Sequence, residues 1–360
     1  MLNDAIDVQI LYQKAKSILA PEVFSFVDSG SGDERALMRN FQCFEQVNLM
    51  PRVLCGLNGI STEIKISEFM AAAPLLIAPA AYHCLLSQNG ELDMLKAANQ
   101  FNTIMIVSMF STIDHKLIAA NKKIPVWLQF YLLKDRAINH NILQLAEECR
   151  FEALVLTVDA PVYAARKRER EQPLKFPSHI SFTHLEALGI PVKESIKTKR
   201  HLSQLLDPSI SWADLDWLAE NTNIPIILKG IMDPRDTEIA LRYPNVKGIV
   251  VSNHGGRQLD SSLSALEVMN QHRLVAGNKI KLFLDGGIRS GSDVFKALAL
   301  GADAALIGRA ALWALTVGGS EAVLKLLSQL KNELHETMAL CGCSTVQDIS
   351  SEFLICKEKL

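Results

Sequence analysis

The chain has 360 residues, 49% of them hydrophobic, and its 37 basic side chains are nearly balanced by 39 acidic ones. A net charge of −2 gives no electrostatic basis for binding nucleic acid, and this apolar fraction suits a well-packed globular core. Prolines or charges interrupt the apolar runs over residues 69–88 and 297–319, so we expect no membrane span, and we expect no secretory signal either. Seven scattered cysteines, including Cys341 and Cys343, indicate reduced thiols rather than disulfides. The histidines show no metal-ligand spacing, and we predict no metal.

Eight short β-type runs recur along the chain, most of them followed by a stretch that is compatible with a helix. Apart from one longer interval, their first residues are separated by 23 to 33 positions, which is the spacing of successive β/α units. Eight such units predict an α/β fold, a (β/α)8 TIM barrel. A doubly wound open sheet is the alternative, but the count of eight favours closure. The predicted strands cover residues 75–80, 103–108, 126–131, 153–159, 225–230, 248–253, 281–286 and 304–309.

The remaining segments surround the barrel. The interval of 72 residues between the fourth and fifth strand starts is too long for one helix, so we predict a mobile or disordered lid loop over about 165–210. It includes the charge-rich residues 167–171 and the polar stretch 193–200. The first 65 residues should form helices that close the bottom of the barrel, and residues 321–355 should form C-terminal helices. No low-complexity linker divides the chain, so we predict a single domain over residues 1–360, with the barrel over about 70–320.

Six of the predicted strands become polar on one face as they reach their carboxyl ends. Ser108, Asp159, Lys229, His254 and Asp285 mark five of these ends, and the strand over residues 126–131 carries Gln129 and Tyr131 on one face. In a parallel barrel these ends form one rim, where barrel enzymes hold their catalytic groups. The alternative, that the strands simply leave the core there, explains one strand better than six. The pattern therefore predicts an active site at this rim.

Two of these loops contain glycines and arginines. Asp285-Gly-Gly-Ile-Arg-Ser-Gly-Ser292 follows the seventh strand, and Gly308-Arg309 ends the eighth. Glycines allow close approach of a ligand, free amides at a helix start attract an anion, and arginine adds a planar cation. These two positions are the usual phosphate site of such barrels, so we predict a phosphate there rather than an ordinary turn with a surface arginine.

Lys229 and His254 carry the other chemical signals. Lys229 ends an apolar strand and could serve as a Schiff-base nucleophile, a phosphate ligand or a fixed cation. His254 lies in Ser252-Asn-His-Gly-Gly-Arg-Gln-Leu-Asp260, beside Arg257 and opposite Asp159. This arrangement indicates a general base with an anion clamp.

At this point the sequence resembles the family of FMN-dependent 2-hydroxy-acid oxidases and dehydrogenases, which includes glycolate oxidase, lactate oxidase, mandelate dehydrogenase and hydroxymandelate oxidase. The resemblance covers nearly the whole chain, and the block over residues 252–260 is its most specific marker. Its other markers are Pro51-Arg52, Ala78-Pro79-Ala80-Ala81, Trp127-Leu-Gln-Phe-Tyr131, Leu156-Thr-Val-Asp-Ala-Pro161, Leu228-Lys-Gly230 and residues 285–299.

The resemblance implies a role for each matching residue. Arg257 and Arg166 would bind the substrate carboxylate, Tyr131 would bond its hydroxyl, and His254 would take a proton while Asp159 stabilises the imidazolium. FMN is the implied cofactor, with Lys229 beside N1 and the C2 oxygen of the flavin. The implied FMN ligands are Pro79, Ala80, Ala81, Ser108, Gln129, Thr157, Lys229, Ser252, Asp285, Gly286, Gly287, Ile288, Arg289, Gly308 and Arg309.

Three departures from the family bear on the substrate. Phe24 stands where we place the family's substrate-binding tyrosine, and Phe110 replaces a frequent tryptophan after the second strand. Ala164 and Ala165 replace the usual glycine and first arginine, which leaves room near the clamp. We therefore expect a substrate with a sizeable apolar or aryl side chain, in contact with Phe24 and Phe110.

The expected reaction is oxidation of an L-2-hydroxy acid to the 2-oxo acid, with O₂ reduced to hydrogen peroxide. The alternatives are a dehydrogenase that passes electrons to a quinone or cytochrome, a flavin-binding barrel without this turnover, and a flavin-free aldolase that uses Lys229. The expected partners are the hydroxy acid and O₂, with no nucleic acid or membrane, and the family resemblance suggests a homotetramer. We expect a cytoplasmic protein, because the terminal Lys-Glu-Lys-Leu matches a peroxisomal address in its last two residues alone.

Overall fold

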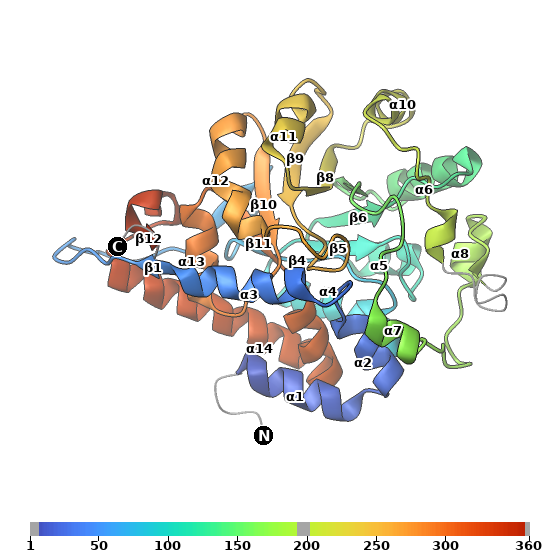
Figure 1. Cartoon of the computed structure of the whole chain (residues 1–360), viewed down its shortest axis with the longest axis horizontal. Coiled ribbons are helices and arrows are strands. Elements are labelled where there is room, and N and C mark those ends of the chain that lie inside the picture. The colour runs from blue at the N-terminus through green and yellow to red at the C-terminus, as the bar shows by residue number, and fades with distance from the viewer. Residues whose placement is uncertain (1–6, 193–201, 357–360) are drawn as a thin grey trace.

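A computed structural model describes residues 7–192 and 202–356 of the chain (Figure 1). Eight parallel strands close into a barrel in the order β10-β11-β4-β5-β6-β7-β8-β9. They span Leu75–Ile77 (β4), Met105–Ser108 (β5), Val126–Phe130 (β6), Leu154–Thr157 (β7), Ile226–Ile231 (β8), Val246–Val251 (β9), Lys281–Asp285 (β10) and Ala304–Ile307 (β11). Each strand overlaps one predicted run, so the predicted (β/α)8 barrel is confirmed and the open sheet is not formed.

The barrel strands are apolar over nearly their whole length, because helices cover their outer side and side chains fill the interior. Every residue of β4, β5, β6, β7 and β11 is buried. Such strands read as continuous apolar runs rather than alternating ones. Trp127 of β6 and Phe283 of β10, on strands that are not neighbours, meet edge to face at 5.6 Å across the interior. The barrel centre is therefore packed, which leaves its rim as the place for a ligand.

A helix follows each barrel strand and packs on the outside of the barrel. Short side chains that accept backbone N–H bonds mark several helix starts, such as Asp233 before α11 and Ser264 before α12. Ser264 forms a capping box with Glu267, and Ser290 forms one with Asp293 before α13. The helices are α4 (Glu91–Phe101), α5 (His115–Asn121), α6 (Arg136–Glu148), α10 (Ala213–Asn221), α11 (Pro234–Ala240), α12 (Ala265–Ala276), α13 (Gly291–Ala299) and α14 (Arg309–Cys341).

The long α14 is two helices joined at Gly318–Gly319, where the backbone leaves helical geometry. By length and composition alone this helix could cross a membrane, but most of its apolar stretch is buried inside the protein. Figure 1 shows α14 lying along α1 (Val8–Ile18), and the two helices are in contact. The apolar character of α14 is thus explained by packing within the fold.

The N-terminal region does not close the bottom of the barrel, and that prediction is wrong. After α2 (Pro21–Asp28) the chain crosses the carboxyl-end rim, where the Ser31 amide donates to the Gly256 carbonyl at 2.9 Å. In α3 (Arg35–Gln46), the Asn40 side chain exchanges hydrogen bonds with Asn253 at 2.8 and 3.0 Å. The hairpin of β2 (Ile64–Ile66) and β3 (Phe69–Ala71) lies at the opposite end, where the residue after it bonds Asn102 just before β5.

The predicted lid, where it is described, contains short helices: α7 (Lys167–Glu171), α8 (Thr183–Ala187) and the 3₁₀ turn η2 (Leu202–Leu205). Its polar stretch at residues 193–200 and the C-terminal Lys-Glu-Lys-Leu lie outside the described residues. The other short elements are the 3₁₀ turns η1 (His83–Leu85), η3 (Val346–Asp348) and η4 (Ser351–Phe353), and an antiparallel pair of β1 (Val47–Leu49) with β12 (Leu354–Cys356).

Candidate active site

A cavity of about 260 Å³ lies at the carboxyl ends of the barrel strands. Ser108 of β5, Gln129 of β6, Thr157 of β7, Lys229 of β8 and Asp285 of β10 all line it. All five side chains are buried in the protein. The polar strand ends therefore meet at one rim, as their alternation along the sequence predicted.

One side of the cavity carries a chain of hydrogen bonds between neighbouring strands. The Ser108 hydroxyl donates to Gln129 Oε1 at 3.0 Å, and Gln129 Nε2 donates to the Thr157 hydroxyl at 3.0 Å. The bonds fix the orientation of the Gln129 amide, because each end of it has a defined partner. This edge presents both donors and acceptors, which is what a planar heterocycle with alternating polar atoms requires.

Lys229 forms the opposite polar feature, a buried cation. Its Nζ lies 2.8 Å from Asp285 Oδ2 and donates to the Ser252 hydroxyl at 3.0 Å. Burial disfavours the charged form, but Asp285 and Asp159 outweigh it, and the pKa of Lys229 is raised above its usual value. A lysine held charged in this way is a fixed cation rather than a Schiff-base nucleophile, since that role needs a neutral amine.

His254 and Asp159 form a hydrogen-bonded pair at the cavity wall. His254 Nδ1 lies 2.8 Å from Asp159 Oδ1, so Nδ1–H donates to the carboxylate and Nε2 remains as the basic nitrogen. Burial lowers the pKa of His254 more than Asp159 raises it, so the imidazole is neutral at pH 7. The pKa of Asp159 is lowered as well, because His254 and Lys229 outweigh its burial. Gln258 Nε2 donates to the Asp159 carbonyl at 2.6 Å and supports the pair. A neutral histidine oriented by an ionised carboxylate can act as a general base.

Two guanidinium groups, those of Arg166 and Arg257, line the cavity near this pair. The Arg257 group is packed against Arg166 and Arg309 without enough anions to match. Burial and then the charge of Arg166 lower the pKa of Arg257 to about 9. A carboxylate that binds here would relieve this repulsion, so the pair forms an anion clamp.

The remaining wall is a row of aromatic rings. Centroid distances along the row are 5.8 Å from Phe26 to Tyr82, 6.3 Å from Tyr82 to Phe110, and 6.1 Å from Phe110 to Tyr131. All four residues line the cavity. Burial, followed by the charge of Asp159, raises the pKa of Tyr131, so its hydroxyl keeps its proton and can donate to a substrate oxygen. Spacings of 4.5–7 Å are those of favourable ring pairs, so the row is a preformed apolar surface.

The glycine- and arginine-containing loops also reach this cavity, but the anion site is not at the start of α13. There, Asp293 accepts from the Arg289 and Ser290 amides, and Glu333 accepts from the Gly291 amide. The helix that begins without a side-chain cap is α14, at Gly308-Arg309, and both residues line the cavity. Burial lowers the pKa of both Arg289 and Arg309 to about 10, as expected for cations that lack an anion.

The comparisons with known proteins decide the family. The sequence matches the model of the FMN-dependent dehydrogenase family over residues 15–356. The chain belongs to this family. It is 39% identical over 354 residues to a 2-hydroxyacid oxidase of Dictyostelium discoideum, covering 98% of this chain and 91% of the relative. It is 39% identical over 352 residues to an L-lactate oxidase of Nostoc sp., covering 95% and 96%. The crystal structure of mandelate oxidase with benzoyl-formic acid superposes with a TM-score of 0.87 at 32% identity, covering 98% of this chain and 99% of that one.

The residues of this family member fit FMN. Arg289, Arg309 and the uncapped start of α14 would hold its phosphate, and the hydrogen-bonded edge of Ser108, Gln129 and Thr157 would face the polar atoms of its ring system. Two buried oxygens, Asp159 Oδ2 and Asp285 Oδ1, have no partner among the described residues, which is typical of a site completed by a ligand. Lys229 adds the cation that favours an anionic ring.

Most residues singled out from the sequence line this cavity. They are Pro79, Ala80, Ala81, Ser108, Phe110, Gln129, Tyr131, Thr157, Arg166, Lys229, His254, Arg257, Asp285, Gly286, Gly287, Ile288, Arg289, Gly308 and Arg309. Asp159 and Ser252 stand behind the wall and act through His254 and Lys229. Gly286 and Gly287 have φ near +90°, and an added Cβ at Gly287 would meet the Asn40 carbonyl oxygen at 1.9 Å. Packing against α3, rather than a ligand's approach, thus requires glycine there.

Phe24 is a wrong assignment. Its ring packs against Tyr12 at 5.6 Å and does not line the cavity, whereas Phe26 does. The two residues are two positions apart on α2, so their side chains point to different sides of the helix. Ala164 and Ala165 are also absent from the lining, and Tyr163 stands there instead.

Sequence reasoning missed Phe26, Tyr82, Tyr163 and Gln258. Gln258 falls inside the specific 252–260 block, and Tyr82 directly follows the motif that ends at Ala81. Their proximity to recognised motifs was the available signal. Nothing in the local pattern of Phe26 or Tyr163 distinguishes them from core residues, because their neighbours in the cavity are distant in sequence.

Proposed function

We propose that this FMN-dependent enzyme oxidises an (S)-2-hydroxy acid with an aryl or large apolar side chain to the 2-oxo acid, with O₂ as the electron acceptor and hydrogen peroxide as the second product. The observation that carries the proposal is the His254–Asp159 pair at 2.8 Å on the same cavity wall as the two guanidinium groups. A base and an anion clamp side by side suit a substrate that has a carboxylate next to the carbon to be oxidised.

Each side chain has a defined task in this reaction. Arg166 and Arg257 bind the carboxylate and thereby orient the neighbouring carbon, because a planar fork holds a carboxylate in one direction. Tyr131 donates to an oxygen of the substrate. His254 accepts a proton on Nε2, and Asp159 stabilises the imidazolium that forms. Bound FMN supplies the acceptor for the two electrons that leave the substrate.

The aromatic row supports the substrate class. Phe26, Tyr82, Phe110 and Tyr131 present a continuous apolar wall beside the clamp, which can bury the face of an aryl group. The solved neighbours are structures of mandelate oxidase, one of them with (S)-mandelic acid. The relatives named lactate and glycolate oxidases favour smaller acids, but the aromatic lining of this chain outweighs them in our proposal.

The identity of the electron acceptor rests on the relatives. Those named above are described as oxidases, and plant (S)-2-hydroxyacid oxidases are 38% and 37% identical to this chain. We therefore favour O₂ over a quinone or cytochrome. We also propose that the protein is cytoplasmic, on the weak match of its last residues to a peroxisomal address.

We propose in addition that copies of the chain assemble into a homotetramer. Met50, Val53 and Leu54 lie on an irregular segment after β1 and expose 55%, 78% and 101% of their surface. Three neighbouring apolar side chains this exposed would be covered by contact between copies. Light scattering on the purified protein, with a Val53→Glu/Leu54→Glu double variant as comparison, tests this. A tetramer that becomes smaller in the variant supports the proposal, and a monomeric wild-type protein contradicts it.

The test of the reaction uses the purified yellow holoenzyme. Anaerobic mixing with (S)-mandelate should bleach the visible flavin absorption, with (R)-mandelate as the matched control that should not. Subsequent mixing with O₂ should restore the colour and yield one hydrogen peroxide per turnover. If reoxidation by O₂ is slow but a quinone restores the colour, the oxidase assignment is wrong. If glycolate or L-lactate gives a higher kcat/KM than mandelate and 2-hydroxyoctanoate, the substrate class is wrong.

A further inference from the structure

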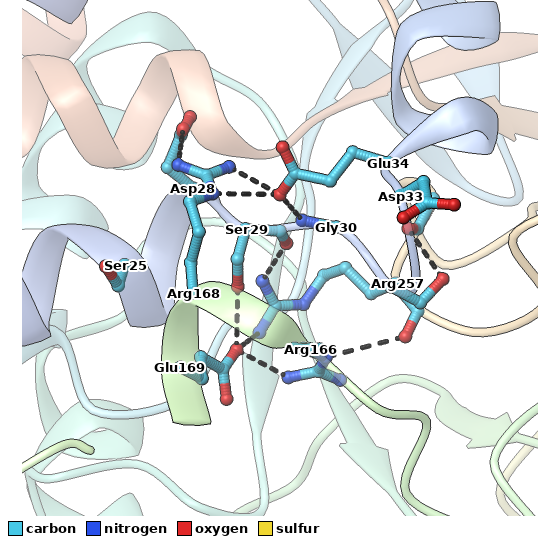
Figure 2. A network of polar contacts seen from close by, with 12 residues as sticks. Ser25, Asp28, Ser29, Gly30, Asp33, Glu34, Arg166, Arg168, Glu169 and Arg257 are labelled. Atoms are coloured by element: carbon cyan, nitrogen blue, oxygen red, sulfur yellow. Dashed lines mark hydrogen bonds and ion pairs between the residues drawn. The ribbon is translucent and has the colours of Figure 1, made fainter. Parts of the chain in front are cut away.

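Glu169 of α7 joins the two clamp arginines from behind. Its Oε1 lies 3.0 Å from Arg166 Nη1, 3.2 Å from Arg257 Nη2 and 2.9 Å from the Ser29 hydroxyl (Figure 2). Its Oε2 accepts from the Tyr163 hydroxyl. The Glu169 side chain is only 9% exposed. Burial opposes its charge, but Arg257 and Arg166 outweigh burial, so the pKa of Glu169 is lowered and the carboxylate is ionised at neutral pH.

The carboxylate of Glu169 and the cavity are on different sides of the arginines. Arg166, Arg257 and Tyr163 line the cavity, whereas Glu169 and Ser29 do not. Arg166 uses Nη1 and Nε on protein acceptors, and Arg257 uses Nη1 and Nη2. Among the described residues, Arg166 Nη2 and Arg257 Nε have no protein partner. A substrate carboxylate can therefore use these donors while Glu169 stays in place.

The rest of α7 holds Glu169 at this position. Arg168 donates to Asp28 at 2.8 Å and to Glu34 at 2.7 and 2.9 Å, and Lys167 pairs with Asp33. Figure 2 shows these bonds tying α7 to the segment after α2, the same segment whose Ser29 carbonyl accepts from Arg257 at 2.8 Å. Three consecutive residues of α7 are thus fixed to partners that are distant in sequence. A carboxylate anchored in this way is a permanent partner of the clamp rather than a plug that substrate must displace.

We propose that Glu169 is a positioning and specificity-determining residue, which sets the planes of both clamp arginines and reduces the clamp's charge from two positive charges to one. A clamp with one net positive charge matches a substrate with one carboxylate and disfavours a dicarboxylate. The proposal rests on the proposed function, because it assumes that the clamp binds the carboxylate of a 2-hydroxy acid.

The test compares charge and geometry separately in the holoenzyme. Glu169→Gln removes the charge at nearly constant size, and Glu169→Asp keeps the charge but shortens the arm that bridges the two arginines. Binding of phenylacetate and of phenylmalonate, which differ by one carboxylate, is followed by the change in flavin absorption. Asp33→Asn is the matched control, because it removes one exposed negative charge next to α7 that does not touch the clamp. Retained FMN and an unchanged visible spectrum show that each variant is folded.

Glu169→Gln should shift the ratio of the two dissociation constants toward phenylmalonate by about tenfold or more, since the clamp then carries two charges. Glu169→Asp should leave that ratio unchanged but slow flavin reduction by mandelate about 10- to 100-fold, because the carboxylate is no longer held in one orientation. Asp33→Asn should change neither. A ratio in Glu169→Gln that equals that of the control overturns the charge role.

Tighter phenylacetate binding with faster reduction in Glu169→Ala would show that Glu169 blocks the site, and would overturn the positioning role. Failure of the proposed function looks different. In that case no 2-hydroxy acid reduces the flavin of the wild-type enzyme, while the ratio of the two anions still reports the role of Glu169.

Discussion

Removal of the Phe110 ring should weaken selection for aryl substrates without affecting the reaction itself. Phe110 lies in the middle of the aromatic row, 6.3 Å from Tyr82 and 6.1 Å from Tyr131, and its side chain is buried at the cavity wall. In Phe110→Ala the phenyl group of mandelate loses one facing ring, whereas lactate has no group that reaches it. The clamp and His254 are unchanged.

The size of the effect follows from the lost contact. A facing ring covers about a quarter of the 150–250 Å² that an aromatic side chain buries, or roughly 50 Å². At about 25 cal/mol per Å² this is worth ~1.3 kcal/mol, and the ring pair adds about 0.5–1.5 kcal/mol. The sum, about 2–3 kcal/mol, corresponds to roughly a 30- to 150-fold loss in kcat/KM for mandelate. The kcat/KM for L-lactate should change by less than about threefold.

Steady-state peroxide formation with the two substrates measures this ratio, and loss of stability cancels from it. Phe182→Ala is the matched control, because Phe182 is equally buried and packs on Tyr82 at 5.8 Å but does not line the cavity. Its mandelate-to-lactate ratio should stay within about threefold of wild type. Equal losses for both substrates in Phe110→Ala would show that the aromatic row supports the fold and does not contact the substrate side chain.

Four further variants test the site and its surroundings. His254→Ala should retain FMN but reduce its flavin with mandelate about 10²–10⁴-fold more slowly, and near wild-type reduction would remove it as the base. In wild type the reduction rate should be flat at neutral pH and fall below pH 6.5, because the pKa of His254 is lowered; in Asp159→Asn this fall should move to lower pH, since burial then acts without the opposing carboxylate, and an unshifted profile would contradict the pairing. Arg257→Lys should raise KM and slow reduction together, because an ammonium cannot reproduce the planar fork, whereas unchanged values would exclude Arg257 from the clamp. Glu91→Gln should lower the free energy of unfolding by about 1–3 kcal/mol, since the buried Glu91 carboxylate accepts bonds from three backbone amides and a hydroxyl. Because the pKa of Glu91 is lowered on folding, the difference between variant and wild type in urea unfolding should be full above pH 4.5 and shrink as pH falls below it; a difference that is independent of pH would contradict this.

The barrel could be predicted from the sequence because its signal is local and repeated. Each strand is a short apolar run whose polar end lies at a fixed place in its own unit, so Asp159, Lys229 and Asp285 could be placed at one rim without knowledge of tertiary structure. The strands are buried on both sides, and no alternative secondary structure explains eight runs at this spacing.

The parts of the site contributed by distant segments could not be predicted in this way. Residues 167–171 read as a solvated charge run, but Glu169 and Arg168 find partners 134 to 140 residues earlier in the chain. The N-terminal helices have no pattern that states which end of a barrel they cover. Phe24 and Phe26 are equally apolar, and only the direction of each side chain on α2 decides which one reaches the cavity.

The crossing of the rim by the N-terminal segment has a consequence for the order of folding. Ser31 contacts Gly256 across 225 residues of chain, and Arg309 bonds the carbonyl oxygens of Val27 and Ser29 across 282 and 280 residues. During synthesis the first 40 residues therefore leave the ribosome long before their partners exist, and closing so long a loop is slow. The β/α units can pair with their neighbours as they emerge, but the clamp and the phosphate arginine gain their N-terminal contacts after the last strand has been made. The binding site should thus be the last part of the molecule to mature, and a nascent chain that stops before Arg309 should hold no flavin.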